Sequence, residues 1–298
     1  MYVRVVLGVI LCALVSTSAM AAGQGRLIVY TVNYPLQYFA QRIAGDHADV
    51  IFPAPADGDP AFWQPSIDII AAYQQADLIL LNGADYAKWI NRAALPRRKL
   101  VDTSAGFSDH YIHVTAGATH SHGPGGDHSH AGTAFTTWLD FNQAAGQARA
   151  IADAMIRERP IWQKDFSRNL AALEADLQTL DQQLQSMVAA QPDQSLLASH
   201  PVYQYLAARY DLDIRSVTWE PDEAPLEMQW VELAAMRADH PASIMLWEAE
   251  PLEATRSRLE KEGIRVVVFS QCGNRPGGGT DFMMVMRENI EALSMAAR

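Results

Sequence analysis

A short stretch of this chain is rich in histidine, a residue type that can bind metal ions or transfer protons. Six of the nine histidines lie between residues 110 and 130. Two His-x-His pairs, separated by the glycine-rich stretch 123–127, contain His120, His122, His128 and His130. Neutral imidazole is a common ligand of Zn²⁺, and His-rich tracts are typical of metal binding. We predict that the two pairs fold around a metal ion, with Asp127 available as an oxygen ligand.

The composition of the surrounding segment limits the strength expected of such a site. Residues 103–133 are rich in Gly, Ser, Thr and His, which predicts a long surface loop. We call residues 110–131 the His-rich loop. A flexible loop loses conformational entropy when it binds an ion, so a site made by the loop alone would be a low-affinity collector. A solvated loop without a specific role is the alternative interpretation.

Residues 1–21 have the features of a cleavable secretory signal. Arg4 precedes an apolar run from Val5 to Val15, and Ala19-Met20-Ala21 offers small residues for a cleavage site. A membrane anchor is the weaker interpretation, because a span needs roughly 18 or more apolar residues. We therefore expect an exported, periplasmic protein.

The charge argues against a nucleic-acid partner, and the cysteine content argues against disulfides. The formal net charge is −11, and removal of Arg4 with the signal makes it −12. Nucleic-acid binding needs a basic face, so no nucleic-acid partner is expected. Only Cys272 would remain after cleavage, so no internal disulfide can form and packing must hold the fold.

Strand and helix patterns alternate through the first half of the chain. Apolar, β-branched runs predict strands at 27–32, 50–53 and 77–83, and a helix is predicted over 35–44, before Gly45. This spacing predicts a parallel sheet with helices on its faces.

A long helical tract separates the two halves. Helix patterns cover residues 142–157 and then, after Pro160, a tract that ends near residue 190. An apolar stripe with spacings of three and four is formed there by Leu170, Leu173, Leu177, Leu180 and Leu184. Such a helix would span on the order of 45 Å.

The second half repeats the alternation. Strands are predicted at 195–199, 214–219, 243–247 and 264–269, and helices at 202–210, 227–238, 251–262 and 281–296. The predicted fold is α/β, with two lobes built on parallel sheets and joined by one long backbone helix. We place the N-terminal lobe at 22–159, the linking helix at 160–191 and the C-terminal lobe at 192–298. The carboxyl ends of the strands, where such sheets bind ligands, can face each other across a cleft.

Several segments of the mature chain are informative because of their order. They are 44–46, 75–83 with Trp89, the His-rich loop, Thr137-Trp138-Leu139-Asp140, 199–210, Glu250-Pro251 and 286–293. In this order they resemble the zinc- and manganese-specific solute-binding proteins of ABC transporters. The resemblance implies two lobes joined by a rigid helix, a metal ion held between them by about three histidines and one carboxylate, and a membrane permease as partner.

The ligand positions implied by this resemblance are only partly kept. His200 matches one family histidine. Ala61 and Thr136 stand where two further histidines are implied, and Ser270 stands where an aspartate is implied. One of four implied ligands is therefore present.

Three explanations for this departure stay open. The His-rich loop can fold into the cleft and supply imidazoles beside His200. Alternatively, the cleft has lost its ion and the loop alone binds metal. In the third explanation, the protein binds another solute or partner.

Other candidate ligands have simpler interpretations. We favour turns with acidic helix caps over metal ligation for Glu220, Asp222, Glu248 and Glu250. His47 and His240 are expected to be solvated, and Cys272 to be an inert thiol rather than a zinc ligand.

The sequence has no motif of an enzyme. His-Glu-x-x-His, Gly-x-Ser-x-Gly and a phosphate-binding glycine loop with a lysine are all absent from it. We therefore expect the periplasmic substrate-binding component of an ABC importer for a divalent transition metal, acting as a monomer. Imidazole ligands favour Zn²⁺ over Mn²⁺, which prefers oxygen. The alternative is a periplasmic metal buffer or chaperone that binds through the His-rich loop only and does not serve import.

Overall fold

The computed structural model describes residues 25–114, 120–121, 127–128 and 132–298. The predicted signal at 1–21, His122 and His130 lie outside the described residues, and only the backbone is described for His120 and His128. No helix within the described ranges is both long enough and apolar enough to cross a membrane.

Four parallel strands form the sheet of the N-terminal half, in the order β2–β1–β3–β4. Their bounds are β1 Leu27–Thr31, β2 Ala48–Ile51, β3 Leu78–Leu81 and β4 Leu100–Asp102. The predicted parallel sheet is confirmed. The edge strand β4 has only three residues, which is too short for a recognisable apolar pattern, so the sequence does not predict it.

Two helices flank this sheet, α1 (Tyr34–Ala44) and α2 (Ile67–Gln75). The first begins where the Asn33 side chain accepts a hydrogen bond from the Leu36 backbone N–H at 3.1 Å, which caps the free amides of the first turn. It ends at Gly45, whose φ of +55° favours glycine. The Asn33 cap therefore directs the chain from the end of β1 into a helix that packs on the sheet.

The C-terminal half contains a second parallel sheet, in the order β10–β9–β11–β12. Its strands are β9 Ser195–Ala198, β10 Asp213–Ser216, β11 Ile244–Trp247 and β12 Arg265–Val268. The helices of this half are α5 Gln204–Tyr210, α6 Glu227–Asp239, α7 Glu253–Lys261 and α8 Phe282–Ala296. All four residues of β11 are buried, as expected for a strand covered on both faces.

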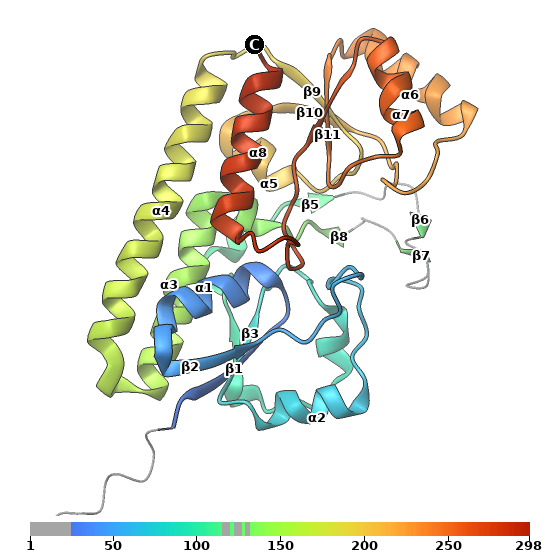
Figure 1. The fold of residues 1–298 in the computed structure, drawn as a ribbon. Helices are drawn as coiled ribbons and strands as arrows, with labels where there is room; N and C mark the ends of the chain where they lie inside the picture. Colours follow the sequence, from blue (N-terminus) through green and yellow to red (C-terminus); the bar gives the residue numbers. More distant parts are fainter. Residues whose placement is uncertain (1–24, 115–119, 122–126, 129–131) are drawn as a thin grey trace, which may run out of the picture.

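One long helix, α4 (Gln163–Ala189), runs along the side of the molecule past both sheets (Figure 1). It packs against α1, α8 and the preceding helix α3 (Phe141–Glu158). Four leucines of the predicted stripe are fully buried, namely Leu173, Leu177, Leu180 and Leu184, whereas Leu170 is only partly buried. At about 1.5 Å per residue, its 27 residues span roughly 40 Å. The two-lobed α/β fold joined by a backbone helix is thus confirmed.

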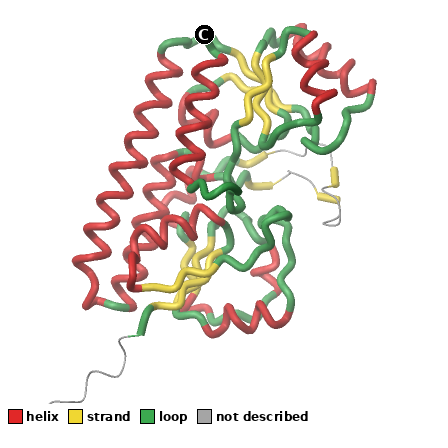
Figure 2. The backbone as a smooth tube through the Cα atoms, viewed as in Figure 1, coloured by secondary structure: helices red, strands yellow, loops and turns green. Residues whose placement is uncertain are grey.

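Loops occupy the region between the two sheets (Figure 2), and they bind one another across it. The Trp138 indole N–H donates to the Gln271 carbonyl oxygen at 2.7 Å, and the Thr136 hydroxyl donates to the Val202 carbonyl oxygen at 2.6 Å. These bonds join the halves close to the strand ends.

The described parts of the His-rich loop form short strand pairs, one of them with the residues directly after the loop. Strand β5 (His113–Val114) is antiparallel to β8 (Gly132–Thr133), and β6 (His120–Ser121) is antiparallel to β7 (Asp127–His128). Residue 120 lies opposite residue 128 in this register. The backbone therefore brings the two histidine-containing segments side by side.

Candidate metal centre

The imidazole of His200 lies two residues beyond the carboxyl end of β9 and is buried, with 1% of the residue exposed. Its Nδ1 is 3.1 Å from the Trp219 carbonyl oxygen. A carbonyl oxygen only accepts hydrogen bonds, so we assign the proton to Nδ1, which donates. Its Nε2 lies 3.2 Å from Glu220 Oε1. The ring is thus held in one orientation, with Nε2 directed at a carboxylate.

A second carboxylate lies on the other side of the ring. Glu248 Oε1 is 3.6 Å from His200 Nδ1, and Glu248 Oε2 accepts a hydrogen bond from the Gln271 side-chain amide. Carboxylates that contact the far nitrogen of a ligating histidine fix its tautomer and raise its basicity. Glu248 is therefore placed to orient His200.

The helix-cap interpretation is wrong for these acidic residues. Helix α6 has Leu226 as its N-cap, and the Leu226 N–H donates to the Gln229 side chain at 2.7 Å. Helix α7 has Leu252 as its N-cap, without a capping side chain. Glu220 and Glu248 contact His200 instead. Strands β10 and β11 lie on either side of β9; Glu248 directly follows β11, and Glu220 follows β10 after a short connection. Glu250 pairs with Arg256 on the surface.

The three substituted ligand positions are occupied by groups with structural contacts. Ala61 is buried, and its N–H donates to Asp59 Oδ1 at 2.8 Å. The Thr136 hydroxyl, buried in the interface, donates to Val202 as described above. The Ser270 hydroxyl accepts from the Cys272 N–H at 3.2 Å. Ala61 fills space, whereas the Thr136 and Ser270 hydroxyls form hydrogen bonds with backbone groups. None of the three is an imidazole or a carboxylate.

A hollow lies between the N-terminal and C-terminal halves. Ala61, Phe62 and Thr136 line it from the N-terminal half, and Pro201, which follows His200, lines it from the C-terminal half. Val114 of the His-rich loop, and Gly132 and Thr133 directly after it, complete the lining. The chain on both sides of the undescribed part of the loop therefore lines this hollow, together with Pro201, the residue after His200.

The remaining histidines and the cysteine have other environments. His240 is buried, with Nε2 2.8 Å from the Leu196 carbonyl oxygen and Nδ1 3.3 Å from Asp213, so the prediction of a solvated ring is wrong for it. His47 is partly exposed, 3.0 Å from Asp165. Burial raises the pKa of the Cys272 thiol to about 12, and the Asp281 charge adds to the rise. Cys272 is thus a neutral thiol, as predicted.

The five predicted ligands form two groups in the sequence. One is His200, and the other consists of the loop residues His120, His122, His128 and His130. Of these, only His200 has a described side chain, and residues 120 and 128 face each other through their backbones. In the described ranges, no three His, Cys, Asp or Glu side chains are arranged to hold a metal ion. A complete site around His200 must therefore use donors beyond those ranges or water.

Comparison with known proteins decides the family. The family model described as ZnuA, zinc-uptake complex component A periplasmic, matches residues 29–296. The chain belongs to this family. The resemblance inferred from the segment order is thereby confirmed, and the family is one of transport components.

Members of the family from two bacteria are similar to this chain over most of its length. The zinc-binding lipoprotein AdcA of Streptococcus pneumoniae strain R6 is 26% identical over 95% of this chain, which spans 58% of that lipoprotein. The high-affinity zinc uptake system protein ZnuA of Bacillus subtilis is 24% identical over 95% of this chain and 91% of that protein.

Solved structures show the same fold. The metal-dependent lipoprotein YcdH of Bacillus subtilis superposes with a TM-score of 0.78 at 21% identity, over 91% of this chain and 99% of that one. The Zn(II)-bound ZnuA-like domain of Streptococcus pneumoniae AdcA gives a TM-score of 0.77 at 22% identity, over 92% of this chain and 99% of the domain.

Proposed function

We propose that this chain captures Zn²⁺ in the periplasm and delivers it to the membrane permease of an ABC importer. The observation that carries the proposal is the buried imidazole of His200 in a chain that belongs to a family of zinc-uptake components. This buried imidazole stands at the strand ends, its orientation is fixed by the Trp219 carbonyl oxygen, and its Nε2 is directed at Glu220.

The His-rich loop supplies the missing imidazoles in this proposal. His120, His122, His128 and His130 are the donors, and they compensate for the loss of histidines at Ala61 and Thr136. Two observations support this assignment. Val114 of the loop and Gly132, directly after it, line the same hollow as Pro201, the residue after His200, and strands β6 and β7 place residues 120 and 128 opposite each other.

Zinc is the preferred ion because the proposed donors are mainly imidazoles. A site of neutral histidines with few oxygen ligands suits Zn²⁺, whereas Mn²⁺ prefers more oxygen. A metal buffer that binds only through the loop is the second candidate, favoured by the replacement of three family ligands.

Calorimetric titration of Zn²⁺ into the metal-stripped mature protein tests the proposal. We expect one tight event in the wild type, and its loss in His200→Ala. His240→Ala is the matched control, since His240 is equally buried but bonded to the Leu196 carbonyl oxygen and Asp213. Identical titrations of the wild type and His200→Ala would overturn the proposal in favour of the buffer.

A further inference from the structure

The contact between His200 Nε2 and Glu220 joins two atoms that are both hydrogen-bond acceptors when the ring is neutral and the carboxyl group is ionised. With the proton on Nδ1, the neutral ring presents a lone pair at Nε2. An ionised carboxylate is also only an acceptor. The two atoms lie 3.2 Å apart, and only 11% of the Glu220 side chain is exposed. A cation, either a proton or a metal ion, is needed between them to make this contact favourable.

The distance suits a metal ion held by both residues. Zn²⁺ binds histidine nitrogen and carboxylate oxygen at about 2.0–2.2 Å, so two ligands of a tetrahedral site lie roughly 3.3–3.5 Å apart. The 3.2 Å between Nε2 and Oε1 is close to this value. Small side-chain adjustments would bring both atoms to bonding distance of one ion.

The neighbouring side chains support this arrangement. Glu248 contacts the protonated nitrogen of His200, and Gln271 holds Glu248 by a hydrogen bond. Glu220 and Glu248 thus have different positions around one ring, the first beside the nitrogen that can bind a metal and the second beside the nitrogen that cannot. Such a carboxylate behind a ligating histidine is a common support in zinc sites.

We propose that Glu220 is a metal ligand of this chain and forms a histidine–carboxylate pair with His200, while Glu248 is a positioning residue. This inference rests on the proposed zinc-binding function and names the oxygen ligand of that site. In this arrangement Glu220 takes the place of the carboxylate that the family resemblance implies at Ser270.

The test compares three substitutions of glutamate by glutamine, which keep size and remove charge. Glu220→Gln should weaken Zn²⁺ binding by more than the roughly 10–100-fold that loss of an outer partner causes, and Glu248→Gln should weaken it within that range. Glu250→Gln is the matched control, because Glu250 lies two residues from Glu248 but forms an exposed pair with Arg256. It should bind as the wild type does.

Visible absorption of the Co²⁺-substituted proteins separates ligation from positioning. Glu220→Gln should change the band positions and intensities, because a ligand is lost, whereas Glu248→Gln should keep the wild-type bands at higher metal concentration. Thermal unfolding of the metal-free variants checks that each one folds.

Two outcomes distinguish this inference from the function on which it rests. Glu220→Gln with wild-type Zn²⁺ affinity and unchanged Co²⁺ bands would mean that only a proton lies between the residues, which overturns the ligand assignment and leaves zinc capture intact. A wild type that binds no Zn²⁺ would overturn both.

Discussion

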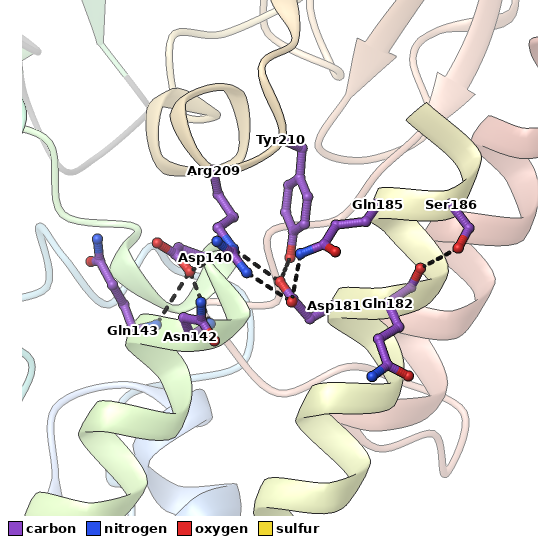
Figure 3. Close-up of polar contacts among 9 residues, drawn as sticks. All are labelled: Asp140, Asn142, Gln143, Asp181, Gln182, Gln185, Ser186, Arg209 and Tyr210. Carbon is purple, nitrogen blue, oxygen red and sulfur yellow. Dashed lines mark hydrogen bonds and ion pairs between the residues drawn. The ribbon is translucent and has the colours of Figure 1, made fainter. Parts of the chain in front are cut away.

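Arg209 on α5 and Asp181 on α4 form a two-pronged ion pair that ties the C-terminal half to the backbone helix. Arg209 Nε lies 3.0 Å from Oδ1 and Nη2 lies 2.8 Å from Oδ2 of the carboxylate. The Tyr210 hydroxyl and the Gln185 amide also donate to Asp181, at 2.9 and 2.8 Å (Figure 3). On its other side, Arg209 is 3.7 Å from Asp140, which caps α3. Three helices thus meet at one arginine.

This junction predicts a large cost for removing the Asp181 charge. Asp181→Asn should lower the free energy of unfolding by roughly 2–3 kcal/mol, between the values for exposed and fully buried pairs. Urea denaturation measures it. Asp176→Asn on the same helix is the control, since its pair with Arg42 is about one third exposed, and it should cost less than about 1 kcal/mol. Equal losses would contradict the role of the junction.

Gly83, which follows β3 after one residue, allows no side chain. Its φ is +74°, and an added Cβ would lie 1.9 Å from Ser104 Oγ and 2.6 Å from the Tyr111 hydroxyl oxygen. Gly83→Ala should therefore lower the free energy of unfolding by roughly 3 kcal/mol, from backbone strain and overpacking together.

A second glycine separates these two costs. Gly263 has a φ of +79° but open space around an added Cβ. Gly263→Ala should lose only the roughly 1–2 kcal/mol of the left-handed backbone. Urea denaturation compares the two variants, and similar losses would show that crowding at Gly83 is unimportant.

The buried thiol of Cys272 predicts a pH effect at the alkaline side. Burial raises its pKa from 9.0 to about 12, so the folded protein keeps a proton that the unfolded chain releases. Stability should therefore fall as the pH rises from about 9 towards 12. The wild type should lose more stability than Cys272→Ala over the lower part of this window, in urea denaturation at successive pH values. Parallel curves for the two proteins would contradict the assignment.

Deletion of residues 118–131 distinguishes the importer component from a loop-only buffer. If the loop completes a site at His200, the deletion should weaken Zn²⁺ binding strongly but leave a residual event that His200→Ala removes. If the loop binds alone, the deletion should abolish all binding, and His200→Ala in the full chain should have no effect. Calorimetric titration of the two single variants and the double variant measures this coupling.

The sequence predicts the framework of this protein well because periodic burial determines it. The stripe from Leu173 to Leu184 and the buried runs of β1 and β3 have the spacing that their packing requires. Short elements such as β4 and α2 lack such a pattern. Their positions depend on contacts with the rest of the fold, which a local window of sequence does not contain.

The environment of His200 is less predictable for a related reason. Glu220 and Glu248 follow His200 at separations of 20 and 48 residues, and each precedes a helix, as a cap would. They meet His200 only because β10 and β11 flank β9. The sequence contains a signal for this cluster, because polar residues follow each of the strands β9, β10 and β11. Recognising that these residues meet requires the order of the strands in the sheet, which the sequence pattern does not give.

Diffraction at the zinc absorption edge from crystals of the zinc-loaded protein tests the central claim most directly. The account predicts an anomalous peak about 2.0–2.1 Å from His200 Nε2. Peaks confined to the His-rich loop, with none near His200, would contradict it and identify the loop as the only binding site.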